Sequence, residues 1–573
     1  MFKLLICCIN SKYIHSSLAP WCLLSDVKEN CGGIIDVSVV EGTINEKMQA
    51  ISERLIEKNP NAIGFCCYIW NIKQVLKVAL QVKTALPQVK IILGGPEVSF
   101  NQKSILAENS FVDFVISGEG EFAFAKLASL LAQNESIPLG LAAMRSGNEI
   151  QLGEYHIAND TVSPYCKEYF DALGGRIAYI ESSRGCPYTC AFCLSGTDRK
   201  VRFFDLDRVK NEMLLLANSG AKTIKFVDRT FNCNKKRAVD ILQFIKANYG
   251  NEIPNNVCFH FEIAADILDD ELLDLIGSMP CGSVQFEAGI QSFNEKTLEA
   301  INRKTNLDKL CRNIEKLVSF QNCHIHIDLI AGLPYEDFSS FAQSFNRAFS
   351  LGANMLQLGF LKILYGSCME TQKDKYPCRY SSEPPYEVIS TPWLTENDLE
   401  FLHFFEDAFE RIYNSGRFRR TVQYILNCTD KTPFDVFSEF SVFVRTKSTE
   451  RPPLDLYTEW IYEFFSEYEQ VDRRILRDMM ITDRIAGNSS GIIPKCLQIK
   501  DDNLKKVKHA LAIKYPMKSG IKRSVAILYS TDSVIFCDYG EKVRVREEYE
   551  LKTESYSKLK KEYFDNSSQN SRQ

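Results

Sequence analysis

The sequence predicts an α/β protein in three parts: a doubly wound, Rossmann-like domain, a partial (β/α)6 TIM barrel, and a mostly helical extension with a small antiparallel sheet. Three observations carry this prediction. The first 135 residues alternate short apolar runs with amphipathic stretches, the pattern of a parallel sheet covered by helices. A second alternation of six such units runs from residue 176 to residue 370. Beyond residue 370, helical patterns rich in Phe and Tyr replace it.

The first domain is expected to span residues 1–135, with strand tips rich in Gly, Ser and aromatic residues. Ligands of such sheets bind at the carboxyl ends of the strands, where glycine lets the backbone approach them closely. Taken singly, these glycines would equally serve as tight strand-to-helix turns. The predicted strands are Phe2–Cys8, Ile34–Val40, Ala62–Tyr68, Lys90–Leu93 and Phe111–Ser117, with helices around 44–58, 72–86 and 121–131.

Residues 136–175 are expected to form a linker with a small hairpin at 140–145 and 150–153. The barrel is expected to span residues 176–370, since six βα units in about 190 residues suffice for a barrel or partial barrel. Its predicted strands are Arg176–Glu181, Thr223–Val227, Val257–Ile263, Ser283–Ala288, Ile325–Ile330 and Met355–Leu361.

The third part is expected to span residues 371–564. Helices are predicted at Ser390–Asn414 and Glu459–Glu469, and their aromatic residues are interpreted as core. Strands of a small antiparallel sheet are predicted at Ser524–Cys537 and Val543–Tyr549. The polar residues 565–573 are expected to be a disordered tail.

Composition indicates a globular protein of the cytoplasm. Apolar residues make up 45% of the chain and charged residues 25%, and the net charge of −5 does not favour nucleic acid as an obligate partner. No apolar run approaches the roughly 20 residues that a membrane helix needs. The start, Met1–Cys8, is too short for a secretory signal and is expected to be a buried strand. The 20 cysteines are scattered, which is typical of reduced thiols rather than of a secreted disulfide framework.

The strongest motif is a cysteine triplet, Cys186, Cys190 and Cys193, directly after the first predicted barrel strand. Thiolates at this spacing can converge on one soft-metal site. A cluster of four irons needs four ligands, so three cysteines leave one iron open to a small molecule. A structural zinc would want a fourth Cys or His nearby, and apart from the triplet none lies between Cys166 and Cys233. The triplet is therefore interpreted as the site of a [4Fe–4S] cluster.

With this triplet, residues 176–370 resemble the radical SAM superfamily, whose members carry the same spacing after the first strand of a partial TIM barrel. The resemblance implies S-adenosylmethionine (SAM) as cosubstrate and places its contacts near the ends of later strands. Asp228 would meet the methionine amino group, Glu262 the ribose or methionine moiety, and Arg303 the SAM carboxylate by bidentate geometry. The implied SAM contacts are Phe192, Asp228, Glu262, Gln291, Arg303 and Ile330. Without the resemblance, Asp228 and Glu262 could as well be ordinary charged residues at strand ends, and Arg303 could be a solvated helix residue.

The turn Gly94-Gly95-Pro96-Glu97 and the strand-turn-helix stretch Asp113–Glu121 precede this barrel. With these features and this domain order, the first domain resembles the cobalamin-binding domain of class B radical SAM proteins. The familiar Asp-x-His-x-x-Gly signature, which supplies a histidine to cobalt, is absent. The lower face of a corrinoid is therefore expected to meet strand-tip residues such as Tyr68 or Trp70, and a degenerate domain that binds no corrinoid is the alternative. The implied cobalamin contacts are Asn10, Ser11, His15, Ser16, Tyr68, Trp70, Gly94, Gly95, Pro96, Glu97, Gly118, Glu119 and Gly120.

The carboxyl-terminal third contains the segments Pro392–Leu394 and Tyr413–Phe418. With them it resembles an uncharacterised extension of such proteins, and by its position it is expected to close the barrel mouth. The combined resemblance implies a radical SAM enzyme, with methyl transfer to an unactivated carbon as the leading reaction. Rearrangement, cyclisation or oxidation without methyl transfer is the second interpretation, and a non-catalytic iron–sulfur redox sensor the third. The expected partners are a one-electron donor such as flavodoxin or ferredoxin and a small-molecule or peptide substrate, with no membrane.

Overall fold

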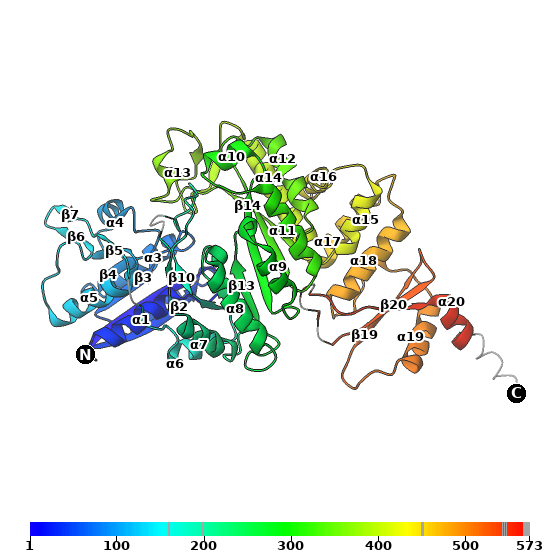
Figure 1. The fold of residues 1–573 in the computed structure, drawn as a ribbon, viewed down its shortest axis with the longest axis horizontal. Coiled ribbons are helices and arrows are strands. Elements are labelled where there is room, and N and C mark those ends of the chain that lie inside the picture. Colours follow the sequence, from blue (N-terminus) through cyan, green and yellow to red (C-terminus); the bar gives the residue numbers. More distant parts are fainter. Residues whose placement is uncertain are drawn as a thin grey trace.

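The computed structural model describes residues 1–158, 161–196, 200–447, 452–540 and 542–564, the last range without residues 544 and 546. The predicted disordered tail at 565–573 lies outside the described residues. Figure 1 shows the three parts in chain order, from the first domain in blue and cyan, through the barrel strands in green, to the extension in yellow and red. The predicted fold class is confirmed.

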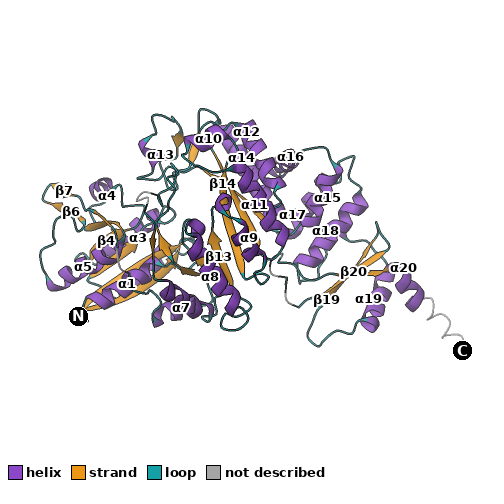
Figure 2. Cartoon of the chain, viewed as in Figure 1, coloured by secondary structure: helices purple, strands orange, loops and turns teal. Residues whose placement is uncertain are grey.

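The first domain is a parallel sheet with helices on both faces (Figure 2). Along β1, Leu4 and Ile6 pack with α1 and α5, whereas Leu5 and Cys7 pack with α2 and α3. The strand reads as one apolar run because helices cover both of its faces. The strands are β1 (Phe2–Asn10), β2 (Ile35–Thr43), β3 (Ala62–Cys66), β4 (Lys90–Gly94) and β5 (Phe114–Gly118), and the helices are α1 (Ala19–Asn30), α2 (Met48–Glu57), α3 (Ile72–Ala85), α4 (Gln102–Glu108) and α5 (Gly120–Gln133).

The predicted linker contributes strands to this first sheet. Its hairpin, β6 (Ala143–Ser146) and β7 (Glu149–Gln151), adds to β5 in antiparallel direction, and β8 (Tyr155–His156) pairs with β5 in parallel. A short helix, α6 (Lys167–Leu173), then leads to the barrel.

The barrel is a six-stranded parallel sheet in the order β16-β15-β14-β13-β12-β9. Phe226, Phe261 and Phe286 lie in contact on neighbouring strands and are fully buried, while polar residues alternate with them along each strand. The strands are β9 (Ala178–Ile180), β12 (Thr223–Phe226), β13 (Cys258–Glu262), β14 (Val284–Gln291), β15 (His324–Ala331) and β16 (Met355–Phe360), and the intervening helices include α7 (Leu206–Ala217), α8 (Lys235–Asn248), α9 (Asp270–Gly277), α10 (Glu295–Ala300), α11 (Leu307–Phe320) and α12 (Phe338–Ser350).

The extension is mostly helical, and its aromatic residues form core as predicted. Phe405 and Phe409 of α14 (Glu396–Phe409) and Phe437 of α16 (Pro433–Arg445) pack on Phe345 of α12. Its small antiparallel sheet contains β19 (Arg523–Leu528), β20 (Ser533–Asp538) and β21 (Lys552–Ser555). The third strand was expected at 543–549, two residues of which lie outside the described residues; β21 takes that place by pairing with β20. None of the described helices has the length and apolar character to cross a membrane.

Candidate functional site

The cysteine triplet lies on a loop whose start is held by a buried carboxylate. The backbone N–H of Ser182 donates to Asp228 Oδ2 at 2.9 Å, and the hydroxyls of Ser182 and Ser183 donate to Oδ1 at 2.7 and 2.5 Å. Burial raises the pKa of Asp228, and these donors act against that rise. The family resemblance implied a SAM contact for Asp228. In the structure both carboxylate oxygens of Asp228 accept hydrogen bonds from Ser182 and Ser183, so this side chain anchors the start of the cysteine loop.

A glycine sets the position of the first cysteine. Gly185 has φ +99°, and a Cβ there would lie 2.1 Å from the carbonyl oxygen of Lys200. Just before it, Ser183–Arg184 (β10) pairs with Arg202–Phe203 (β11). Only glycine fits so close an approach of two backbones, so the place of Cys186 follows from this contact.

Each of the three thiols has a polar neighbour. Cys186 Sγ lies 3.5 Å from the Thr230 hydroxyl, Cys190 Sγ accepts from Arg303 Nη1 at 3.7 Å, and Cys193 Sγ accepts a backbone N–H at 3.4 Å. Burial raises the pKa of Cys190, and Arg303 opposes this rise. Among the described residues, the three sulfur atoms do not all lie within 4.8 Å of one another, the spacing that ligands of a single metal ion would show. Three thiolates on one loop are soft ligands of the kind that iron–sulfur clusters use.

Two polar side chains with unused hydrogen-bonding capacity lie beside this loop. A register shift between Gly289 and Gln291 puts Gln291 at φ +75°, so that its side chain folds back over Gly289. Arg303 Nη2 donates to the Gly289 carbonyl. Gln291 Oε1 and Arg303 Nε are nevertheless buried without a hydrogen-bond partner among the described residues. Buried polar atoms are seldom left unpaired, so this cradle fits a ligand with carboxylate and amino groups, as SAM has.

The other residues implied for SAM lie around the same barrel mouth. Glu262, at the end of β13, accepts two hydrogen bonds from Arg229 Nη1 at 3.0 and 3.2 Å. Phe192 on the cysteine loop and Ile330 on β15 are half-buried and pack against the barrel core. Glu262, Gln291 and Ile330 therefore lie at the carboxyl ends of barrel strands, where ligands of such barrels bind, while Arg303 reaches Cys190 and Gly289 from beyond α10.

The barrel lumen is a charged network that the sequence interpretation missed. Glu287 accepts from His260 Nε2 at 2.9 Å and from Lys225 Nζ at 3.2 Å, and His326 Nε2 lies 2.9 Å from Asp328 Oδ1. Burial works to raise the pKa of Glu287, but His260, Lys225 and His326 hold it well below its ordinary value. Asp328 next to His326 raises the pKa of that imidazole against the effect of burial. The period-two spacing of these residues on their strands is the signal that would have found them.

A cavity of about 680 Å³ lies between the first domain and the barrel. Twelve of the thirteen residues implied for cobalamin line it, the exception being Glu97, which instead accepts a hydrogen bond from Tyr386 of the extension at 2.6 Å. The cysteine loop contributes Gly185, Leu194 and Ser195 to the same wall. The cavity is therefore lined both by the strand tips of the first domain and by the cysteine loop, and we call these two sets of residues the cofactor loops.

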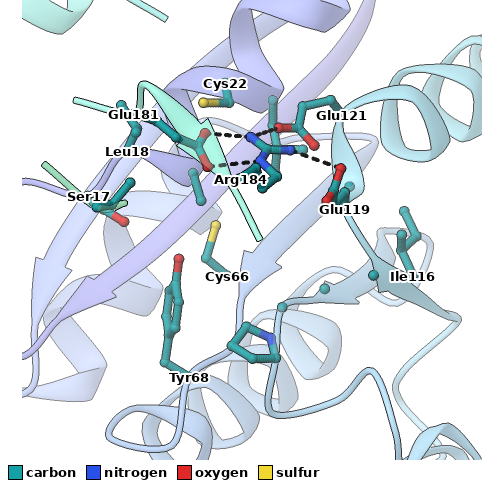
Figure 3. Close-up of a pocket in the computed structure, with 18 of the residues that line it drawn as sticks. Ser17, Leu18, Cys22, Cys66, Tyr68, Ile116, Glu119, Glu121, Glu181 and Arg184 are labelled. Atoms are coloured by element: carbon teal, nitrogen blue, oxygen red, sulfur yellow. Dashed lines mark hydrogen bonds and ion pairs between the residues drawn. The ribbon is translucent and has the colours of Figure 1, made fainter. Parts of the chain in front are cut away.

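Aromatic, thiol and imidazole side chains face the cavity from the first domain, and a guanidinium faces it from the barrel. Figure 3 shows the Tyr68 hydroxyl and the Cys66 thiol pointing toward it from the first domain, opposite the guanidinium of Arg184. The rings of Tyr68 and Trp70 stack with centroids 4.4 Å apart. His15 Nδ1 lies 2.7 Å from the Tyr179 hydroxyl of β9, and burial lowers the pKa of His15, which favours a neutral imidazole. Cavity size and the glycine-rich strand tips fit a large planar ligand.

Three family models match consecutive parts of the chain. Residues 6–128 match the B12 binding domain, residues 180–347 the radical SAM superfamily, and residues 374–529 a protein family of unknown function (DUF4080).

Two curated proteins and one solved structure illustrate the similarity. The cobalamin-dependent radical SAM methyltransferase TokK of Streptomyces tokunonensis is 28% identical over 62% of this chain and 54% of its own length. The anaerobic magnesium-protoporphyrin IX monomethyl ester cyclase of Cereibacter sphaeroides is 24% identical over 52% of this chain and 51% of its own length. The cobalamin-dependent radical enzyme OxsB, solved with aqua-cobalamin and SAM, superposes with a TM-score of 0.58 at 11% identity over 91% of this chain and 82% of its own. This chain spans about half the length of the curated relatives it matches.

Proposed function

Since this chain is a class B radical SAM protein, with a B12-binding domain, a radical SAM domain and a DUF4080 extension in that order, we propose that it is a cobalamin-dependent methyltransferase acting on an unactivated carbon. One observation carries the proposal: the cavity of about 680 Å³ is walled both by the strand tips of the first domain and by the cysteine loop. A methyl donor held on one side would face a radical-generating site on the other. When bound, the cluster and SAM supply one-electron chemistry and the corrinoid supplies a transferable methyl group.

The chain's own residues bind and orient these groups. Cys186, Cys190 and Cys193 would hold the cluster, while Arg303 and Gln291 would meet the polar end of SAM. Glu262, Phe192 and Ile330 would complete that pocket, and a one-electron donor such as flavodoxin or ferredoxin would reduce the cluster.

The segment where the barrel meets the extension holds one side of the cysteine loop. The backbone N–H of Met369, in the short helix α13 (Cys368–Thr371), donates to the Ala191 carbonyl at 2.8 Å, and Met369 is buried. On the other side of the loop, the Ala191 N–H donates to the Ile301 carbonyl at 2.8 Å. A loop held on both sides protects reactive species from side reactions.

Anaerobic reconstitution of the full chain with iron, sulfide and hydroxocobalamin tests the proposal. After gel filtration, we expect bound iron and corrinoid, and with dithionite and SAM we expect 5′-deoxyadenosine. Cys186→Ala should abolish iron binding and deoxyadenosine, whereas Cys281→Ala, an exposed cysteine outside the loop, should change neither.

Each failure has a distinct meaning. Loss of corrinoid with a full cluster would refute methyl transfer and favour cyclisation, rearrangement or oxidation, chemistry of the kind named for the cyclase relative. A full cluster that yields no deoxyadenosine would favour the redox sensor. With a substrate in hand, transfer of an isotopically labelled methyl from SAM decides between the first two.

A further inference from the structure

Arg184, two residues before the first cysteine, binds carboxylates from both sides of the domain junction. Its Nε and Nη2 donate to the two oxygens of Glu181 at 2.9 and 2.7 Å, a bidentate pair within the barrel. Its Nη1 and Nη2 also reach Glu119 at 3.2 Å and Glu121 at 2.9 Å in the first domain (Figure 3). All four side chains are at least four-fifths buried, with exposed fractions between 8% and 18%. Charge-assisted bonds of this kind are the strong ones in proteins.

A second arginine doubles the link. Arg202 lies directly opposite Arg184 in the β10–β11 pair and donates to both oxygens of Glu119. The two arginines hold the pKa of Glu119 below its ordinary value, although burial alone would raise it. Glu119 is the N-cap of α5 and follows Gly118, whose φ of +82° brings the backbone against the His156 carbonyl. The ion pairs thus attach to a sharply defined turn at the cavity wall.

Another ion pair spans the same junction, but its two side chains do not line the cavity. Arg176 Nη2 lies 2.7 Å from Glu41 Oε2, with side chains only 7% and 16% exposed. Neither residue lines the cavity or belongs to the cysteine loop. This pair, whose own side chains lie outside the cavity wall, therefore also holds the two parts of the chain together, and Glu41 additionally accepts from Asn10 Nδ2 at 3.3 Å. Arg184 differs because both ends of its ion pairs are cavity-lining loops.

We propose that Arg184 is a positioning residue that couples the two cofactor loops, so that a corrinoid against residues 118–121 and a cluster on the cysteine loop each stabilise the binding of the other. This coupling rests on the proposed function, since it requires both cofactors. Without Arg184, the charges of Glu121 and Glu181 would repel each other across the junction, because Glu121 already acts to raise the pKa of Glu181. By linkage, the two cofactors must change each other's affinity by the same factor.

The test measures that factor with hydroxocobalamin as the probe. The visible spectrum gives its Kd for full-length protein, prepared anaerobically with and without the reconstituted cluster. In the wild type we expect the cluster to tighten binding about tenfold, within the usual range of coupling between sites. Arg184→Gln should bring the ratio of the two Kd values to about one, and Arg184→Lys should restore part of it because the charge returns without the bidentate geometry. Arg176→Gln is the matched control and should keep the wild-type ratio.

A second route guards against a misfolded variant. Glu119→Gln with Glu121→Gln leaves the Arg184–Glu181 pair intact and should also remove the coupling while iron content stays at the wild-type level. Two results overturn the coupling but leave the proposed function standing. In one, the two Kd values of the wild type are equal; in the other, Arg184→Gln or the double variant keeps the ratio of Kd values that the wild type shows. Absence of corrinoid binding in every preparation overturns both.

Discussion

Replacing Gly185 by alanine should displace Cys186, the first of the three cysteines proposed to hold the cluster. The new Cβ would lie 2.1 Å from the Lys200 carbonyl oxygen, whereas real Cβ atoms keep at least 3.0 Å, so the two backbones must separate by about 0.9 Å. Metal–ligand distances tolerate only about 0.2 Å. The positive φ adds about 1–2 kcal/mol of strain for an L-residue. We therefore expect the loop's affinity for its cluster to fall about tenfold or more, the range seen when residues supporting metal ligands are changed.

The assay is iron and sulfide per protein after anaerobic reconstitution at limiting iron. Gly220→Ala is the matched control, since Gly220 has φ +86° but no atom of the described residues would come within 4 Å of a Cβ added there. It should carry the conformational strain alone and load like the wild type. Equal loading of Gly185→Ala and Gly220→Ala would refute the reasoning, because the close backbone approach would then not position Cys186.

Three further outcomes follow from individual contacts. Asp228→Asn should lower the free energy of unfolding by about 1–3 kcal/mol, because it leaves a buried donor unpaired. Hydrogen exchange at the Ser182 amide should become faster, and an unchanged exchange rate there would contradict the anchoring role. Arg303→Gln should weaken SAM binding to the reconstituted protein about tenfold without loss of iron, whereas equal losses of SAM and iron would point to a structural role. Glu336 is fully buried, and burial raises its pKa to about 7, against hydroxyls of Ser292 and Ser344 that donate to it. The folded chain holds this proton more tightly than the unfolded one. The contribution of Glu336 to the free energy of unfolding is therefore complete below about pH 4.5 and falls by on the order of 3 kcal/mol as the pH rises to 7. Glu336→Gln should remove that slope and raise the melting temperature at pH 8; an identical slope in both proteins would rule this out.

Much of the fold could be predicted from the sequence because its evidence is local. Apolar runs such as Phe2–Cys8 alternate with helical stretches wherever a parallel sheet is covered on both faces. The cysteine triplet is likewise a local feature, since three thiols on one loop need no distant residue to suggest a shared site. The hairpin at 143–151 was visible as a hairpin, yet its pairing with β5 was not, because a hairpin's sequence does not specify which sheet edge it joins.

The candidate site depended far more on contacts between distant residues. The sequence marked Asp228 as a strand-end acid, but only the fold brings Ser182 and Ser183 to its two oxygens, 46 and 45 residues away. Glu97 has the same strand-tip position as its neighbours and still turns to the extension.

The sequence by itself determined the order of the three parts, the soft-ligand loop and the glycine-rich strand tips, since each is written in consecutive residues. Tertiary structure alone decided that the tips and the loop share one cavity, that the lumen is charged, and that Arg184 joins the two walls. The physical reason is that the partners of a buried charge are chosen by proximity in space, and proximity between Glu119 and Arg184 arises only once both domains have packed.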